Sequence, residues 1–446
     1  MDALLVGLAG VALLLLLLLL GMHVGMALII TGFLGLTTVL GLERALEMSV
    51  GAIYGKISGT ALVTLPLFIL VGYLASGGGI SRDIYASLEL LVGRFRSGLG
   101  MATVLACTAF GTVCGSSLVT AAVFAKISAP EMRARGYEKG FAYGICAAAG
   151  SIGMLIPPSI LAIVYGMLSG VSIGKLLIAG IVPGILWAVL FCVAIALYPR
   201  IRPQAIRPPE PARAVPLSRK LLSLGSWWPI VLSAGIIFGG IYGGVFTPTE
   251  ASAVAAFVLF LIYLYRGVVR GRGRGIGERF RELYGILNET ATTSAMIFLV
   301  LGAATVFSNF TVLTGLTTRL SEFVIGLGLS QMSLVIGFAL VYLLLGCFID
   351  SISMLSITIS LFNPIVNAAG IDAIWYAVVV ILAIEVGFIT PPFGINLYSV
   401  LGVAEKDVEI KDLIVGTFPF LIAELISIVV ILLFPALATY LPAFVR

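Results

Sequence analysis

Charged residues are scarce in this sequence. Asp, Glu, Lys and Arg make up 11% of its 446 residues, whereas hydrophobic residues make up 60%. A soluble domain does not need so large an apolar fraction to fill one core. The composition therefore excludes an ordinary soluble globular protein and predicts a polytopic membrane protein embedded in a lipid bilayer.

The sequence also has few residues of the kinds that form catalytic or metal centres. His23 is the only histidine, and no motif pairs carboxylates or sets a serine beside it. The five cysteines lie in apolar segments without CxxC or metal-binding spacing, so we interpret them as buried hydrophobic residues. We therefore expect no enzyme, no transition metal and no organic cofactor, and an intramembrane hydrolase is a weaker alternative.

Long apolar runs predict membrane-spanning helices. Most of these runs are at or near the roughly 20 residues that cross a bilayer as a helix. They are too long and too uniformly apolar for the alternating strands of a membrane barrel. The runs cover residues 4–20, 22–40, 176–198, 227–246 and 251–265.

The net charge of +5 does not indicate a nucleic-acid partner, because the cations lie in short loops between apolar runs. Residues 200–220 and 266–281 carry six Lys or Arg each, so we expect both segments in the cytoplasm. If two further segments dip into the bilayer and return, 21 of the 26 Lys and Arg residues are cytoplasmic. Both termini are then expected on the periplasmic side of a prokaryotic inner membrane.

A Pro- and Arg-rich stretch divides the chain into two predicted halves. Residues 200–225 read as a cytoplasmic linker, because repeated prolines prevent a long helix. The first half, 1–199, is expected to hold scaffold helices, an arm, hairpin 1 near 99–125 and a broken helix near 137–169. The second half, 226–446, is expected to hold scaffold helices, hairpin 2 near 331–363 and a broken helix near 372–402.

The two halves share an ungapped repeat with an offset of 234 residues. This offset aligns Pro157–Pro158 with Pro391–Pro392, Gly153 with Gly387 and Ser117 with Ser351. Gly and Pro set the backbone conformation, so chance matches of Leu and Ala do not explain this register. Each copy predicts a re-entrant hairpin with a Gly/Ser-containing or acidic tip, followed by a helix interrupted at a diproline.

The charge of the loops gives the two copies opposite directions, which is an inverted-topology repeat. Non-helical backbone at membrane depth is tolerated only where it is buried or lines an aqueous cavity, so the paired breaks indicate a transport site. We expect Pro158 and Pro392 to occupy the first turn of the half-helix that follows, whose free N–H groups would face an anion. Prolines that merely kink packed helices are the alternative interpretation.

The tips and breaks supply the candidate binding residues. Hydroxyl and carbonyl oxygens there suit Na⁺ or a substrate carboxylate. Asp350 lies at the second tip, where we favour a role near a Na⁺ ion, while Glu385 either caps freed amides or binds. The substrate candidates are Ser116, Ser117, Pro158, Ser159, Ser351, Pro392 and Gly394, and the Na⁺ candidates are Gly115, Ser116, Gly153, Asp350, Ser351, Gly387 and Thr390.

Three polar groups outside the tips receive structural interpretations. Thr247, Pro248 and Glu250 in the segment TPTE are typical of a capping box at a helix start. His23 is expected in a loop or at the membrane interface. Lys56 is expected to pair with another helix or to extend its amine toward the interface.

Three segments of the sequence, residues 135–184, 242–255 and 363–398, resemble the large (M, DctM-like) subunit of the tripartite ATP-independent periplasmic, or TRAP, transporters. The resemblance implies Na⁺-driven uptake of a dicarboxylate or similar small organic anion by an elevator motion. It also implies a small membrane subunit (Q) and a periplasmic substrate-binding protein (P) as partners. Where the family commonly carries Asp after the first tip, this chain has Thr120, so no carboxylate is available there.

These inferences predict an all-α, elevator-type secondary transporter that is a Na⁺ symporter. A channel is the alternative of a different class, but a channel usually repeats a pore lining in an oligomer, whereas this chain encloses two inverted half-sites. Among transporters, the alternative is a stand-alone Na⁺/carboxylate symporter that needs no binding protein. The sequence does not specify the substrate.

Overall fold

The computed structural model describes residues 3–93, 95–206, 216–270 and 276–444. Parts of the two basic segments, 207–215 and 271–275, lie outside the described residues. Within the described ranges the chain is helical and contains no strand, only an isolated bridge between Tyr137 and Ile206. The predicted all-α class is thereby confirmed.

The chain begins with helices that precede the first repeat copy. A 3₁₀ turn, η1, joins α3 to α4. These elements are α1 (Ala3–Leu19), α2 (Val24–Leu40), α3 (Leu42–Ile57), η1 (Thr60–Val63), α4 (Thr64–Gly77) and α5 (Ile80–Val92).

The first copy and the helices that follow it form one continuous block. It consists of α6 (Gly98–Cys114), α7 (Ser117–Ala134), α8 (Lys139–Leu155), α9 (Ile160–Ser169), α10 (Ile173–Ala179), α11 (Ile181–Ile201) and η2 (Pro203–Ala205).

After the linker, a second set of helices leads to the second copy. One of them contains a π-helical segment, η4, within a nearly continuous apolar run. The set comprises α12 (Leu217–Leu224), η3 (Gly225–Trp227), α13 (Trp228–Ala234), η4 (Gly235–Gly239), α14 (Gly240–Tyr242), α15 (Pro248–Arg270), α16 (Ile276–Leu313) and α17 (Leu316–Gly326).

The second copy occupies the C-terminal part of the chain. It comprises α18 (Gln331–Gly346), α19 (Ser351–Ala368), α20 (Ala373–Ile389) and α21 (Ile395–Leu401), and it is followed by α22 (Ile410–Leu433), α23 (Ala436–Thr439) and η5 (Leu441–Phe444). Helices α19 and α20 begin and end 234 residues after α7 and α8 respectively. The helix boundaries therefore follow the register that the prolines and glycines predict.

Several helices can cross a bilayer by length and composition. Among the described residues, seven helical segments satisfy this criterion, and α8 with α9, bent by 43° at their break, would make an eighth. Helices α1, α2, α6, α18 and α20 are also apolar but have 16 or 17 residues each. The chain is thus a multi-pass membrane protein.

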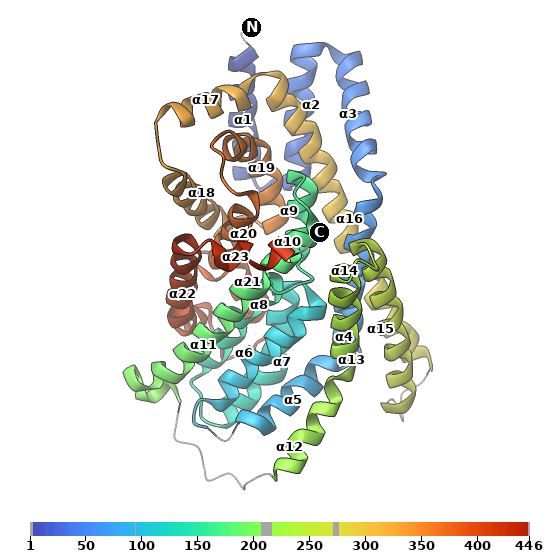
Figure 1. Cartoon of the computed structure of the whole chain (residues 1–446), viewed down its shortest axis with the longest axis vertical. Coiled ribbons are helices and arrows are strands. Elements are labelled where there is room, and N and C mark those ends of the chain that lie inside the picture. The colour runs from blue at the N-terminus through green and yellow to red at the C-terminus, as the bar shows by residue number, and fades with distance from the viewer. Residues whose placement is uncertain (1–2, 94, 207–215, 271–275, 445–446) are drawn as a thin grey trace.

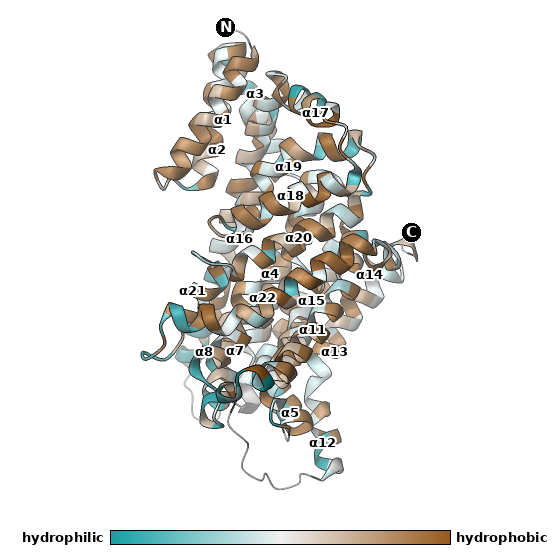
Figure 2. Ribbon diagram, turned by 90° about the vertical axis from the view of Figure 1, so that its left-hand side faces the viewer, coloured by the Kyte–Doolittle hydropathy of each residue, from teal (hydrophilic) through white to brown (hydrophobic). Residues whose placement is uncertain are grey.

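The two hairpins lie on opposite sides of the broken helices along the long axis of the molecule. Figure 1 shows α6 and α7 below α8, α20 and α21, with α18 and α19 above them. Figure 2 also shows α18 and α19 above α20 and α21, with α7 below them, and α20 and α22 are predominantly hydrophobic in it. The direction of each hairpin relative to a membrane remains a prediction.

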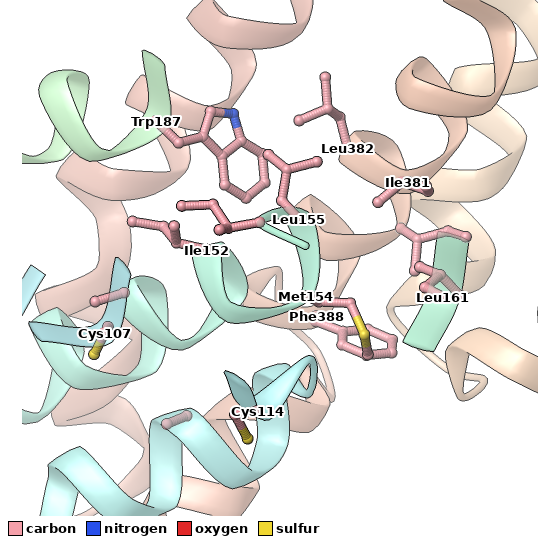
Figure 3. Close-up of a cluster of buried hydrophobic side chains, with 14 of the residues drawn as sticks. Cys107, Cys114, Ile152, Met154, Leu155, Leu161, Trp187, Ile381, Leu382 and Phe388 are labelled. Atoms are coloured by element: carbon pink, nitrogen blue, oxygen red, sulfur yellow. The ribbon is translucent and has the colours of Figure 1, made fainter. Parts of the chain in front are cut away.

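The hydrophobic core joins the two copies. Figure 3 shows Leu155 of α8, Leu382 of α20 and Trp187 of α11 in one buried cluster. A second, smaller cluster holds α1, α2 and α16 together around Phe307 and Phe310. The broken helices therefore pack against one another, while the N-terminal helices have a core of their own.

Candidate functional site

The first hairpin tip is docked onto the first break. Helix α6 ends at Gly115, whose φ of +64° lies in the left-handed region that glycine adopts without steric cost. The backbone N–H of Ile160 donates to the carbonyl of Gly115 at 3.3 Å. A Cβ built on Gly115 would lie only 2.1 Å from the carbonyl oxygen of Pro158. The predicted tip and the predicted break therefore meet backbone to backbone.

The residues after Gly115 start the returning limb. Ser116 has extended backbone and is the N-cap of α7, where its Oγ accepts from the N–H of Val119 at 3.5 Å. Ser117 is the first residue of α7 and is buried. Thr120 stands at the position where the family commonly has Asp. Its hydroxyl donates to the carbonyl of Ser116 at 2.8 Å and so bonds to the backbone of the tip.

At the second tip a carboxylate caps the returning helix, as the Ser116 hydroxyl does at the first tip. Asp350 is the N-cap of α19, and its Oδ1 accepts from the N–H of Ser353 at 3.0 Å. In the 234-residue register Asp350 corresponds to Ser116, so both returning limbs are capped at the same position. Ser351 is buried, as Ser117 is. The structure thus gives Asp350 a capping role that the sequence-based interpretation did not include.

The prediction that Pro158 and Pro392 lie in the first turn of the half-helices is wrong. Helix α9 begins at Ile160 and is capped by Ser159, whose Oγ accepts from the N–H of Ala162 at 3.1 Å. Helix α21 begins at Ile395, after Gly394 with a φ of +52°. A capping residue needs non-helical backbone, so Ser159 and Gly394 delay each helix past the proline.

The second break differs from the first in its exposure. Helix α20 ends at Ile389, and the hydroxyl of Thr390 donates to the carbonyl of Val386 at 2.6 Å. Residues 391–393 are exposed, whereas 157–159 are buried. The second tip meets its break through the rings of Phe348 and Phe393, whose centroids are 5.6 Å apart.

Gly153 and Gly387 lie where a hairpin limb crosses a broken helix. A Cβ on Gly111 of α6 would lie 2.8 Å from the Cα of Gly153. In the second copy, a Cβ on Gly387 would lie 2.7 Å from the Cα of Gly346 in α18. Both glycines therefore permit a close approach of helices, and the structure provides this packing reason for their occurrence in both copies.

Polar contacts connect the two copies across the core. Ser117 of α7 donates to Oε1 of Glu385 in α20 at 3.4 Å. Asn396 of α21 donates to Ser151 of α8 at 3.2 Å, and Ser399 donates to the carbonyl of Leu118 at 3.2 Å. At the first tip and break the structure brings together several of the site residues predicted from the sequence, namely Gly115, Ser116, Ser117, Pro158 and Ser159. Ser117 also contacts the second copy through its hydrogen bond to Glu385.

Two cavities lie near these elements. A cavity of about 30 Å³ lies beside Ser116, lined also by Tyr73 of α4, Ile160 of α9 and Thr293 of α16. A larger cavity, of about 600 Å³, lies between α3, the end of α9 and the turn before α15. Lys56 lines the larger cavity, and its Nζ donates to the carbonyl of Met167 at 2.7 Å, so this amine bonds to a helix end rather than to a carboxylate.

An ion-pair network joins α7 and α8 to the loop before α22. Arg133 pairs with Asp407 at 2.8 Å and also with Glu405, and Lys139 pairs with Asp412 at 2.8 Å. The hydrogen bond from Arg133 holds the pKa of the Asp407 carboxyl below its ordinary value. All three acidic residues belong to the second copy or the helix after it, so the network is a further connection between the copies.

Two structural interpretations are confirmed. Thr247 and Glu250 form a reciprocal capping box, since the N–H of Thr247 donates to Glu250 Oε2 at 2.8 Å and the N–H of Glu250 donates to Thr247 Oγ1 at 3.3 Å. His23 lies between the first two helices, as the N-cap of α2.

Sequence reasoning did not identify Glu424 and Asn396, which are fully buried beside Glu385 and Ser151. The signal available in the sequence was a glutamate in the apolar run FLIAELISIVV and an asparagine directly after the second break. Their proximity depends on how α20, α21 and α22 pack, which no local pattern gives.

A family model described as "Tripartite ATP-independent periplasmic transporter, DctM component" matches residues 11–437 of the chain. The chain is 32% identical to the C4-dicarboxylate TRAP transporter large permease protein DctM of Pseudomonas aeruginosa, over 85% of this chain and 86% of that one. It is also 32% identical to the sialic acid TRAP transporter large permease protein SiaM of Vibrio cholerae, over 95% of both chains. The ectoine/5-hydroxyectoine large permease protein UehC of Ruegeria pomeroyi is 32% identical, over 95% of this chain and 96% of that one.

Among solved structures, the chain is similar to the YdaH transporter of Alcanivorax borkumensis. The TM-score is 0.62, with 17% sequence identity over 87% of this chain and 88% of that one. At this identity the likeness concerns the fold alone.

Proposed function

The chain belongs to the DctM component family of the tripartite ATP-independent periplasmic transporters, and we propose that it is a large permease that takes up a small organic anion together with Na⁺. In this proposal a periplasmic binding protein delivers the substrate and a small membrane subunit accompanies the permease in the inner membrane. The match over residues 11–437 supports the transporter class. The substrate and the coupling ion are the parts that need experiment.

The names of the relatives support an organic anion of the carboxylate class. C4-dicarboxylate, sialic acid and ectoine differ in size but each carry a carboxylate, whereas isethionate, named for a further relative, carries a sulfonate in its place. A binding protein that selects the substrate, and a permease site that recognises an anionic carboxylate or sulfonate group, would account for one permease family with several cargoes. The particular substrate of this chain is therefore expected to be set mainly by its binding protein.

The proposed substrate site lies at the tips and breaks. Helix α9 has ten residues, and the positive end of its dipole lies at the first break, where it would stabilise an anion; the N–H groups of Ile160 and Ala162 there already donate to Gly115 and Ser159. The substrate residues we propose are Ser116, Ser117, Pro158, Ser159, Ser351, Pro392 and Gly394.

The proposed Na⁺ sites lie beside the same tips. A hard cation takes oxygen ligands, and carbonyls that leave a helix at a tip or break are available for this role. The small cavity beside Ser116, of about 30 Å³, is compatible with an ion that has lost its water. The Na⁺ residues we propose are Gly115, Ser116, Gly153, Asp350, Ser351, Gly387 and Thr390.

An elevator motion is the proposed mechanism. The contacts Ser117–Glu385 and Asn396–Ser151 support a body in which the hairpins and broken helices move together. The separate core formed by α1, α2 and α16 supports a second body that stays fixed. Movement of one body against the other would expose the site to each side of the membrane in turn.

The observation that carries the proposal is the docking of the first tip on the first break, in a chain that matches the transporter family over nearly its whole length. The test is substrate uptake by proteoliposomes that contain the chain and its small subunit, under an imposed Na⁺ gradient, with and without the binding protein. Candidate substrates are a C4-dicarboxylate, sialic acid and ectoine. We expect uptake only with both the binding protein and the gradient, and a K⁺ gradient of equal size is the control.

The alternative is a stand-alone Na⁺/carboxylate symporter. Equal uptake without the binding protein would favour this alternative and contradict the tripartite assignment. Uptake that is unchanged when K⁺ replaces Na⁺ would instead contradict Na⁺ coupling.

A further inference from the structure

An acidic cluster lies buried among helices of both copies, away from the two tips. Its members are Ser151 of α8, Glu385 of α20, Asn396 of α21 and Glu424 of α22, and Ser427 lies three residues after Glu424 on the same helix, where the two side chains are neighbours. Each of these side chains is 0% exposed. Burying two charged carboxylates away from solvent destabilises the folded protein unless hydrogen bonds or positive charges nearby compensate the lost hydration.

The register of α8 and α22 explains why Ser151 faces Glu424. The two helices approach at glycines, because a Cβ on Gly144 would lie 2.5 Å from the carbonyl carbon of Gly416. Gly140, one turn earlier, meets Asp412 in the same way, so the helices run in the same direction. Two turns beyond the Gly144–Gly416 contact come Ser151 and Glu424.

The cluster has more free oxygen atoms than donors. Within the part of the chain that the structure describes, Glu385 Oε2, both carboxylate oxygens of Glu424, Asn396 Oδ1 and Ser427 Oγ have no hydrogen-bond partner. Asn396 uses its amide N–H to donate to Ser151, so its free Oδ1, an atom of the same amide group, also lies near Ser151. Unpaired buried polar atoms are rare in folded proteins, so oxygens that gather in this way indicate a missing positive ligand.

The charge of the cluster sets the charge of that ligand. The carboxyl groups of Glu385 and Glu424 interact with each other, and Ser151 interacts with both. Ser117, the first residue of α7, donates to Glu385, and the positive end of that 18-residue helix compensates this carboxylate. Among the described residues, no Lys, Arg or His contributes to the environment of either carboxylate. A cation at Glu424 would supply the positive charge that this carboxylate otherwise lacks.

We propose that Glu424, Glu385 and Asn396 form a buried Na⁺ site, completed by the hydroxyls of Ser151 and Ser427. Carboxylate, amide and hydroxyl oxygens are hard ligands that suit an alkali cation. The site is distinct from the two tip sites and rests on the proposed Na⁺ coupling. It links α22 to the first turn of α21, so the bound ion holds the second half-helix against the rest of the core.

The test is Na⁺ binding to the purified full-length chain, measured by calorimetric titration of NaCl into choline buffer. We expect Glu424→Gln to bind one Na⁺ fewer, or to weaken one site by about tenfold or more. The control Glu322→Gln changes a carboxylate that is 62% exposed on α17 and should match the unchanged chain. CaCl₂ is titrated in parallel, and saturable Ca²⁺ binding at this site without Na⁺ binding would overturn the proposal.

The thermal midpoint in Na⁺-free buffer separates ion binding from a structural role. Glu424→Gln removes a buried unpaired charge while keeping the side-chain volume, so its midpoint should be unchanged or higher, whereas the increase that Na⁺ gives the unchanged chain should shrink. Ser427→Ala is a milder variant, expected to fold normally and to weaken Na⁺ binding by about threefold. Unaltered Na⁺ affinity and stoichiometry in both variants would refute this site alone. Absence of Na⁺ binding to the unchanged chain would refute the proposed coupling as well.

Discussion

The docking of the first tip on the first break can be tested at Gly115. The change Gly115→Ala places a methyl group at a φ of +64°, which costs about 1–2 kcal/mol for a residue with a Cβ. The same methyl group would lie 2.1 Å from the carbonyl oxygen of Pro158, so the tip has to move away. This movement adds overpacking of about 1–3 kcal/mol and weakens the Ile160–Gly115 hydrogen bond, worth about 1 kcal/mol. We expect a total loss of about 3–6 kcal/mol.

The matched control is Gly170→Ala. Gly170 ends α9 with a φ of +79° and is exposed, and a Cβ there would have no atom within 4 Å. This variant therefore costs only the backbone strain, about 1–2 kcal/mol. The difference between the two variants, about 2–4 kcal/mol, measures the docking contact.

The assay is thermal unfolding of both purified variants in detergent, followed by tryptophan fluorescence, together with uptake in proteoliposomes. The midpoint should fall about three times as far for Gly115→Ala as for Gly170→Ala, and only Gly115→Ala should reduce uptake. Equal midpoint shifts, with uptake retained in both variants, would show that the tip does not depend on this contact.

The remaining predictions concern a cap, an ion pair and topology. Asp350→Ala should lower the free energy of unfolding by about 1 kcal/mol, and Asp350→Asn should lower it much less, because Asn also caps helices. Loss of Na⁺-dependent uptake in Asp350→Asn would then show that the negative charge of Asp350 is needed for uptake. Unchanged Na⁺ dependence would contradict the proposed role of Asp350 as a Na⁺ ligand. Arg133 lowers the pKa of Asp407, so their pairing stabilises the chain above the ordinary Asp pKa and is lost as the pH falls through the lowered value. Melting curves should therefore show a deficit in Arg133→Gln at neutral pH that shrinks in acid, and a constant deficit would exclude the pair as its cause. A membrane-impermeant thiol reagent should label Val245→Cys from the periplasm and Leu222→Cys only after the cytoplasmic side is opened, and the reverse pattern would invert the predicted topology.

Much of the fold could be predicted because Gly and Pro determine backbone conformation locally. Pro157–Pro158 and Pro391–Pro392 marked both breaks, and the spacing between them gave the offset at which α19 and α20 repeat the bounds of α7 and α8. Gly136 and Gly370, aligned by the same offset, both have positive φ. Such signals do not depend on which other helices are nearby.

Details of the site could not be predicted, because they depend on competition among neighbouring groups. Diproline chemistry suggested that Pro158 would start a half-helix, yet Ser159 is the better N-cap and moves the helix start to Ile160. Asp350 suggested an ion ligand, and one of its oxygens is used by the N–H of Ser353. Glu424 gave no positional signal, since its relation to Glu385 depends on the glycine contact between α8 and α22.

The two tip–break contacts are equivalent in sequence register but unequal in environment. The first is buried and formed by backbone, whereas the second leaves Phe348 61% and Phe393 52% exposed while their rings touch. In the proposed elevator motion the hairpins and broken helices move as one body, so this inequality between the two contacts should be kept when that body moves. The transition to the opposite state should therefore leave the contact between Gly115 and Pro158 closed, while the surroundings of the exposed pair Phe348 and Phe393 change as the body moves.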